Sequence, residues 1–220
     1  MRVTNAAQQK ENYKMKVLLF NGSPRANGCT FTALSLIAEE LKVQGIDSEI
    51  LQAGNKPVQD CVACGGCAGK GKCVMGDFVN DFIDKAATAD GFVFGTPVYY
   101  AHPTGRILSI MDRMFYAGSQ NFKHKPAAVI ASARRGGTTA SLDTLVKPLE
   151  MVQMPIVSSS YWNMIHGNSP EETLRDLEGV QTMQNLAKNM AWLLKCIEAG
   201  KKAGITAPNN DPIVRMNFIR

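Results

Sequence analysis

Short runs rich in apolar residues, alternating with amphipathic stretches, constrain the fold of this chain more than any other feature. Runs of five or six such residues bounded by Gly, Asn or Pro are typical of strands buried on both faces. We predict strands at residues 16–20, 46–51, 91–95, 127–132 and 156–160. Between them, apolar residues recur every three or four positions, which is the period of an α-helix. This period predicts helices over 31–44, 78–89, 103–116 and 141–153, the last kinked by Pro148.

A fifth helix is predicted after the last strand. Ser169-Pro170-Glu171-Glu172 is a capping box with Pro at the first helical position, and an apolar stripe from Leu174 to Ile197 follows it. Repeated strand–helix units imply an α/β fold with a parallel sheet covered on both faces. Ligands of such sheets bind beyond the carboxyl ends of the strands, so the loops there are the candidate site.

The 220 residues suit one large domain, which we place at residues 15–206 with an insertion at 54–76. Residues 1–14 read as a polar N-terminal extension. The tail at 207–220 is too short to fold alone and yet carries several apolar residues. We therefore expect it to pack on a neighbouring subunit of a homodimer or homotetramer.

Charge and hydropathy exclude several classes of partner. The net charge of +5 is spread along the chain, without the basic–aromatic interleaving typical of nucleic-acid binding. No stretch approaches the roughly 20 apolar residues that span a bilayer, and the first fourteen residues contain no apolar signal core. Six cysteines in such a chain read as reduced thiols or metal ligands, so we expect a cytoplasmic protein with no membrane and no nucleic-acid partner.

The loop that follows the first strand has the character of an anion site. It leads from Asn21 to Thr30 and into a helix, whose N-terminus offers free N–H groups to a phosphate. Ser23, Asn27 and Thr30 add short polar side chains, and Arg25 adds a cation. The loop matches neither G-x-x-x-x-G-K-[ST] nor G-x-G-x-x-G, which favours a monophosphate over a nucleoside triphosphate.

Two motifs carry a resemblance to a known family. The stretch N-G-S-P-R-x-x-G-x-T, followed by G-x-P-V-Y-Y after the third strand, resembles the NADPH-dependent FMN reductases among flavodoxin-like proteins. The resemblance covers roughly residues 16–160. It implies a three-layer sandwich with a five-stranded parallel sheet of order 2-1-3-4-5, a bound FMN, and NAD(P)H as co-substrate.

The same resemblance implies which residues would hold the FMN. Its phosphate would be held by the loop after the first strand, and its ring by the loops after the third and fourth strands. The predicted binding residues are Ser23, Arg25, Asn27, Cys29, Thr30, Pro97, Val98, Tyr99, Tyr100, Ala133, Arg134, Gly136 and Gly137. Arg134 and Arg135 would favour an anionic reduced flavin or bind the 2′-phosphate of NADPH.

Four cysteines crowd the insertion with the spacing C-x2-C-x2-C-x5-C: Cys61, Cys64, Cys67 and Cys73. Compact runs of this kind suit iron–sulfur clusters, whereas structural zinc usually uses two separated pairs. Lys70 and Lys72 would stabilise thiolates and favour a redox-active dithiol instead. The residues leave cluster, thiols and zinc open. The pattern resembles the iron–sulfur flavoproteins of the family, which implies a [4Fe-4S] cluster.

The resulting expectation is an FMN-binding oxidoreductase that takes electrons from NAD(P)H. It would pass them to a flavin, a quinone or another small acceptor, with the cluster as a relay. The alternative is an iron–sulfur flavoprotein that transfers electrons from ferredoxin without its own NAD(P)H turnover. A third reading is a redox sensor whose thiols report oxidation.

Overall fold

The computed structural model describes residues 14–211 and 214–218, so the predicted N-terminal extension lies outside the described residues apart from Lys14. Six strands form: β1 (Lys16–Asn21), β2 (Asp47–Gln52), β3 (Gly91–Tyr99), β4 (His102–Pro103), β5 (Ala127–Ala133) and β6 (Met164–His166). The helices are α1 (Cys29–Val43), α2 (Phe78–Ala87), α3 (Gly105–Gly118), the 3-10 turn η1 (Ser119–Asn121), α4 (Thr138–Met151), α5 (Pro170–Thr173) and α6 (Leu177–Lys202).

The strands build one sheet in the order β2-β1-β3-β5-β6, with every neighbouring pair along this path parallel. The two-residue β4 is an addition that pairs antiparallel with the end of β3. Without it, the order is the predicted 2-1-3-4-5, so the flavodoxin-like topology is confirmed.

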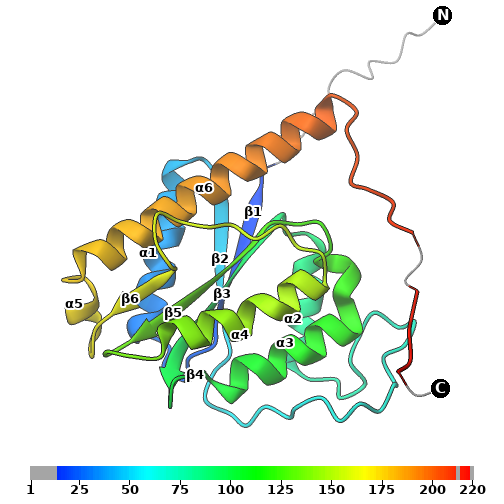
Figure 1. The fold of residues 1–220 in the computed structure, drawn as a ribbon, viewed down its shortest axis with the longest axis horizontal. Coiled ribbons are helices and arrows are strands. Elements are labelled where there is room, and N and C mark those ends of the chain that lie inside the picture. The colour runs from blue at the N-terminus through cyan, green and yellow to red at the C-terminus, as the bar shows by residue number, and fades with distance from the viewer. Residues whose placement is uncertain (1–13, 212–213, 219–220) are drawn as a thin grey trace, which may run out of the picture.

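Helices cover both faces of the sheet, as Figure 1 shows, with α1 and α6 on one face and α2, α3 and α4 on the other. One apolar core lies under α1 and α6 and is centred on residues such as Leu34, Ile37 and Met190. The other lies under α2, α3 and α4 and contains stacked rings, among them Phe20 and Phe94 with centroids 4.8 Å apart. The three-layer architecture follows from strands that are apolar on both sides.

The predicted strand at 156–160 is wrong in position. The chain makes only a bridge to Ala127 there, with the Val157 N–H donating to the Ala127 carbonyl at 2.8 Å. Ser159 then donates its hydroxyl to the Thr182 carbonyl of α6 at 2.6 Å, which draws the chain away from the sheet. The strand forms instead at β6, four residues before the next helix begins.

The long helix predicted from Ser169 is two helices. Ser169 accepts from the Glu172 N–H and starts α5, as the capping box predicts, but α5 ends at Thr173. Asp176 then accepts hydrogen bonds from the N–H groups of His166 and Gly179, so its carboxylate caps a new helix and joins it to β6. In α4 the predicted kink is not a break: the helix starts at Thr138 and contains Pro148 one turn from its end, where one lost N–H bond matters little.

Candidate functional site

The loop after β1 is held by a chain of hydrogen bonds that leads across the sheet edge. The Ser23 N–H donates to Asn21 Oδ1 at 3.1 Å, and the Asn21 side-chain amide donates to Gln52 at 2.6 Å. Gln52 in turn donates to the Ser23 carbonyl at 2.8 Å. These side chains of β1 and β2 hold the backbone of the loop in place, just before the first turn of α1.

The N-terminus of α1 opens into a pocket at the carboxyl ends of the strands. The N-cap residue is Gly28, which has no side chain to cap the first N–H groups, so these donors remain for an anion. Buried Ser23 and Thr30 and exposed Arg25 stand around this helix end. The pocket is lined by Ser23, Arg25, Gly28, Cys29, Thr30, Pro97, Val98, Tyr99, Ser132, Ala133, Arg134, Gly167 and Asn168.

One wall of this pocket is a tight hairpin between β3 and β4. Its two turn residues, Tyr100 and Ala101, have φ angles of 50° and 60°, the left-handed conformation that a two-residue type I′ hairpin requires. The buried Thr96 hydroxyl fixes the hairpin, because it accepts from the Thr104 N–H at 3.0 Å and donates to the Pro97 carbonyl at 2.9 Å. Pro97, Val98 and Tyr99 therefore face the pocket as a constrained segment.

The loop after β5 closes the pocket from the other side and touches the hairpin. Gly137 has a φ of 91°, and a Cβ there would lie 2.5 Å from the Ala101 Cα. Only glycine allows both this φ and this approach of the two loops. Gly137 thus sets how far apart the two walls stand, although it does not line the pocket itself.

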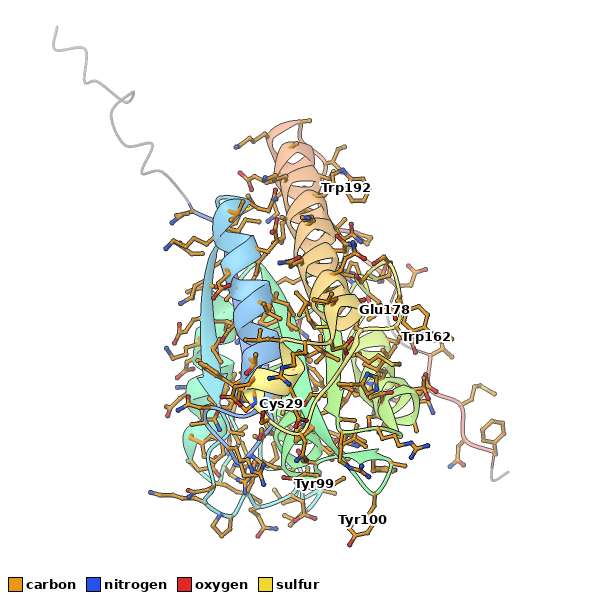
Figure 2. All side chains as sticks on the ribbon, turned by 90° about the vertical axis from the view of Figure 1, so that its left-hand side faces the viewer. Cys29, Tyr99, Tyr100, Trp162, Glu178 and Trp192 are labelled. Carbon is orange, nitrogen blue, oxygen red and sulfur yellow. The ribbon has the colours of Figure 1, made fainter. Side chains whose placement is uncertain are left out.

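Nine of the thirteen predicted FMN-binding residues line this one pocket. The other four lie outside its lining: Asn27, Tyr100, Gly136 and Gly137. Figure 2 shows Cys29 and Tyr99 at the same end of the molecule, with Tyr100 projecting outward and fully exposed. The roles of all thirteen remain predictions.

Four pocket residues were not among those predicted, and one of them is Gly28, the N-cap residue of α1. Ser132 shares a 2.7 Å hydrogen bond with Thr30, which joins β5 to α1 inside the pocket. Gly167 and Asn168 follow β6, and the Cys29 thiol lies 3.6 Å from the Gly167 carbonyl. A correct position for the last strand would have found the latter two, because they occupy the loop at its carboxyl end.

The four clustered cysteines surround a second pocket. It has a volume of about 130 Å³ and is lined by residues of the 54–76 segment and of the second half of α3. Its walls combine these thiols with mostly apolar side chains, among them Val62, Val74, Met75 and Ala117. Cys64 is exposed and the other three are half-buried. In the described part of the chain, which includes all six cysteines, every thiol is free.

The segment wraps around its pocket through left-handed residues. Gly65, Gly69 and Gly71 have φ angles between 67° and 70°, and Ala63 has one of 51°. A left-handed residue turns the chain sharply. These turns accompany an arrangement in which four thiols from thirteen residues line one pocket.

A buried arginine anchors this segment to the domain. Arg113 of α3 pairs with Asp77 through two hydrogen bonds of 2.6 and 2.8 Å. The guanidinium holds the pKa of the Asp77 carboxyl below its usual value, and the carboxylate raises the pKa of Arg113. Arg113 Nε also lies 3.4 Å from the sulfur of Cys73. The sequence signal that we missed is a charged residue within the buried stripe of α3, between Ile110 and Ala117.

The pocket brings together four cysteine thiols, the donor set that an iron–sulfur cluster takes. Within residues 14–211 and 214–218, no group of three or more His, Cys, Asp or Glu side chains converges closely enough to hold one metal ion. A cube of four irons takes one cysteine at each iron, so its ligands surround a shared space rather than meeting at a point. Four thiols around one apolar pocket fit that requirement.

The chain is similar in sequence to known flavoproteins. The chain matches the NADPH-dependent FMN reductase family over residues 15–169. It is 30% identical to an iron–sulfur flavoprotein of Methanocaldococcus jannaschii, over 84% of this chain and 100% of that protein. With an iron–sulfur flavoprotein of Methanosarcina thermophila the identity is 27%, over 85% of this chain and 99% of that protein.

The fold is shared more widely than the sequence. A flavodoxin from the domain Archaea superimposes with a TM-score of 0.57 at 13% identity, over 82% of this chain and 99% of the flavodoxin. Across the residues that the structure describes, no helix has the length and apolar character to cross a membrane. On its sequence match and its fold, the chain belongs to the NADPH-dependent FMN reductase family, in its iron–sulfur flavoprotein branch.

Proposed function

We propose that this flavin-binding oxidoreductase takes electrons from NAD(P)H onto FMN and passes them to a small acceptor such as a flavin or a quinone. We further propose that Cys61, Cys64, Cys67 and Cys73 bind a [4Fe-4S] cluster that relays these electrons. The observation that carries the proposal is that the four cysteines share one pocket in a domain whose sheet edge forms a second, anion-suited pocket.

The first pocket fits FMN in its chemistry. The uncapped N–H groups of α1, with Ser23, Thr30 and Arg25, would hold the phosphate. The backbone of the Pro97–Tyr99 segment and of Ala133 and Arg134 would hold the ring. Bound FMN would supply the hydride and single-electron chemistry, whereas the protein positions the ring and sets its electrostatic surroundings.

Helix α3 connects the two pockets. Its N-cap residue Thr104 donates to the Gly22 carbonyl at 2.9 Å, beside the phosphate loop, and Arg113 and Tyr116 line the cysteine pocket. Arg113 lies nine positions after Thr104, a rise of about 14 Å along the helix axis. Helix α3 therefore contacts the backbone before the loop proposed for the phosphate and also lines the pocket proposed for the cluster.

The alternative function is an electron-transfer module supplied by ferredoxin, without NAD(P)H turnover. It is favoured by the exposed apolar rim of the cysteine pocket, formed by Val62, Val74 and Tyr116. Such a rim would let a protein donor approach the cluster. Reduction of the FMN by NADPH alone separates the first function from this alternative.

Paired variants test the two cofactor assignments separately. The double change Ser23→Ala with Arg25→Ala should abolish stable FMN binding, whereas Lys42→Ala at the far end of α1 should not. Retention of FMN by the double variant would refute the phosphate site.

For the cluster, Cys64→Ser should remove iron and keep FMN. Cys196→Ser on α6 is the matched control and should keep both. Unchanged iron in Cys64→Ser would refute the assignment of the cluster ligands.

A further inference from the structure

Arg113 is a cation in an apolar setting, and the oxidoreductase chemistry proposed above does not use it. Its side chain is 0% exposed, on a helix face made of residues such as Ile110, Met114 and Ala117. Burial of a charge is costly unless its donors are satisfied, so the partners of Arg113 indicate what the residue is for.

Three of its contacts tie down the ends of the cysteine segment. The two terminal nitrogens bind the Asp77 carboxylate, which also caps α2, and one of them donates to the Gln59 carbonyl at 3.2 Å. Gln59 precedes the first cysteine by two residues, and Asp77 follows the last by four. Arg113 thereby clamps the segment on both sides of its pocket.

The fourth contact is the informative one. Arg113 Nε lies 3.4 Å from the Cys73 sulfur, as a charge-assisted donor. The backbone of Cys73 is held independently, because Asn80 accepts from its N–H at 2.8 Å and donates to its carbonyl at 2.9 Å. Asn80 thus holds the backbone of Cys73, whereas Arg113 Nε acts on the position and charge of its sulfur.

We propose that Arg113 is a positioning residue for the cluster. Its Nε–H donates to the Cys73 sulfur and thereby raises the reduction potential of the cluster. This inference rests on the proposed function. Reduction adds one electron to a cluster, and hydrogen bonds to the cysteine sulfurs stabilise that added negative charge. The Asp77 carboxylate balances most of the guanidinium charge, so the local donor matters more than the net charge.

The test is a redox titration of three variants after anaerobic reconstitution with iron and sulfide. Arg113→Lys keeps a cation but loses the Nε–H, Asp77→Asn keeps the Nε–H but loses the balancing anion, and Asn80→Ala loosens Cys73 without touching its sulfur. Iron content, the potential of one-electron reduction by dithionite, and the melting temperature of the metal-free protein are measured for each.

We expect Arg113→Lys to make reduction about tenfold less favourable, a potential about 59 mV lower. Asp77→Asn should not lower the potential, because the positive charge of Arg113 then loses the carboxylate that balances it. An unchanged potential in Arg113→Lys, or an equal fall in Asn80→Ala, would overturn the inference.

A variant that loses its iron gives no potential to compare. Arg113→Gln therefore serves as a second variant, and its iron content and melting temperature are measured as well. If both Arg113 variants lose iron while the metal-free melting temperature is unchanged, the positioning role is supported. If both Arg113 variants lose iron and the melting temperature of the metal-free protein also falls, Arg113 is purely structural and the inference is overturned. A wild-type protein that binds no iron would overturn the cluster assignment itself, and this inference with it.

Discussion

Replacement of Gly137 by alanine tests whether contact between two loops sets the geometry of the proposed flavin pocket. Gly137 lies in the loop after β5, with a φ of 91°, where its backbone meets the turn after β3. A left-handed conformation costs a non-glycine residue about 1–2 kcal/mol. The added Cβ would also lie 2.5 Å from the Ala101 Cα and 2.8 Å from the Val98 side chain, so the backbone must move.

Further contributions set the expected loss of stability. Overpacking of this kind costs about 1–3 kcal/mol, and alanine is a poorer N-cap than glycine at the start of α4. The lower entropy of the unfolded alanine chain offsets about 0.4–1 kcal/mol. The net loss should be about 2–4 kcal/mol, divided between the folding free energy and the affinity for FMN, because the turn can yield by moving away from the pocket.

The neighbouring residue provides the control. Gly136 is exposed, and a Cβ there would meet nothing within 4 Å. We expect Gly136→Ala to leave urea unfolding within about 0.5 kcal/mol of wild type. Gly137→Ala should lower the urea midpoint by about 1 M or more, or weaken FMN binding about tenfold for each 1.4 kcal/mol that appears in the affinity.

The assays are urea unfolding of the flavin-free protein and titration of FMN fluorescence. If Gly137→Ala matched both wild type and Gly136→Ala in midpoint and Kd, the two loops could not be in the contact described here.

Two further predictions concern the supports of the two pockets. Thr96→Val should cost about 1–3 kcal/mol and weaken FMN binding, because it leaves the buried Thr104 N–H without its acceptor. Thr144→Val on α4 is the matched control, because its half-buried hydroxyl donates only to the Ala140 carbonyl of the same helix. An equal effect of both changes in thermal unfolding would contradict this reasoning. Asp77→Asn should cost about 2 kcal/mol at pH 7, less than for a fully buried pair because Asp77 is a third exposed. Since the folded-state pKa of Asp77 lies below its unfolded value, this stabilisation is present above about pH 4 and is lost as the pH falls through the lowered pKa. Urea unfolding of wild type and variant from pH 7 to pH 3 should therefore converge, and a constant difference would show that the ion pair is not its source.

The topology could be predicted from the sequence because β1, β3 and β5 are apolar on both faces, a pattern with few alternatives. The last strand could not be placed, because two short stretches, 156–160 and 164–166, lie along the same edge of β5 and only the second forms a strand. The choice depends on Ser159 binding α6 and Asp176 binding His166, which are contacts between residues 10 or more positions apart. Local pattern carries no information about such bonds.

The same limit separates the parts of the site that were predicted from those that were missed. The loops proposed to hold the phosphate and the ring of FMN follow strands whose parallel order brings them to one edge, and residues of all three line one pocket, as expected. Gly167 and Asn168 were missed with the strand that precedes them. Arg113 was missed because its partners Asp77 and Cys73 lie 36 and 40 positions away, and a lone arginine in a helix otherwise reads as exposed.

The most direct test of the account is a visible spectrum of protein purified without oxygen, recorded before and after NADPH, with assays for iron and acid-labile sulfide. We predict bound flavin with about four irons per chain, and bleaching of the flavin by NADPH alone. Protein that carries neither flavin nor iron under these conditions, and takes up neither on reconstitution, would contradict it.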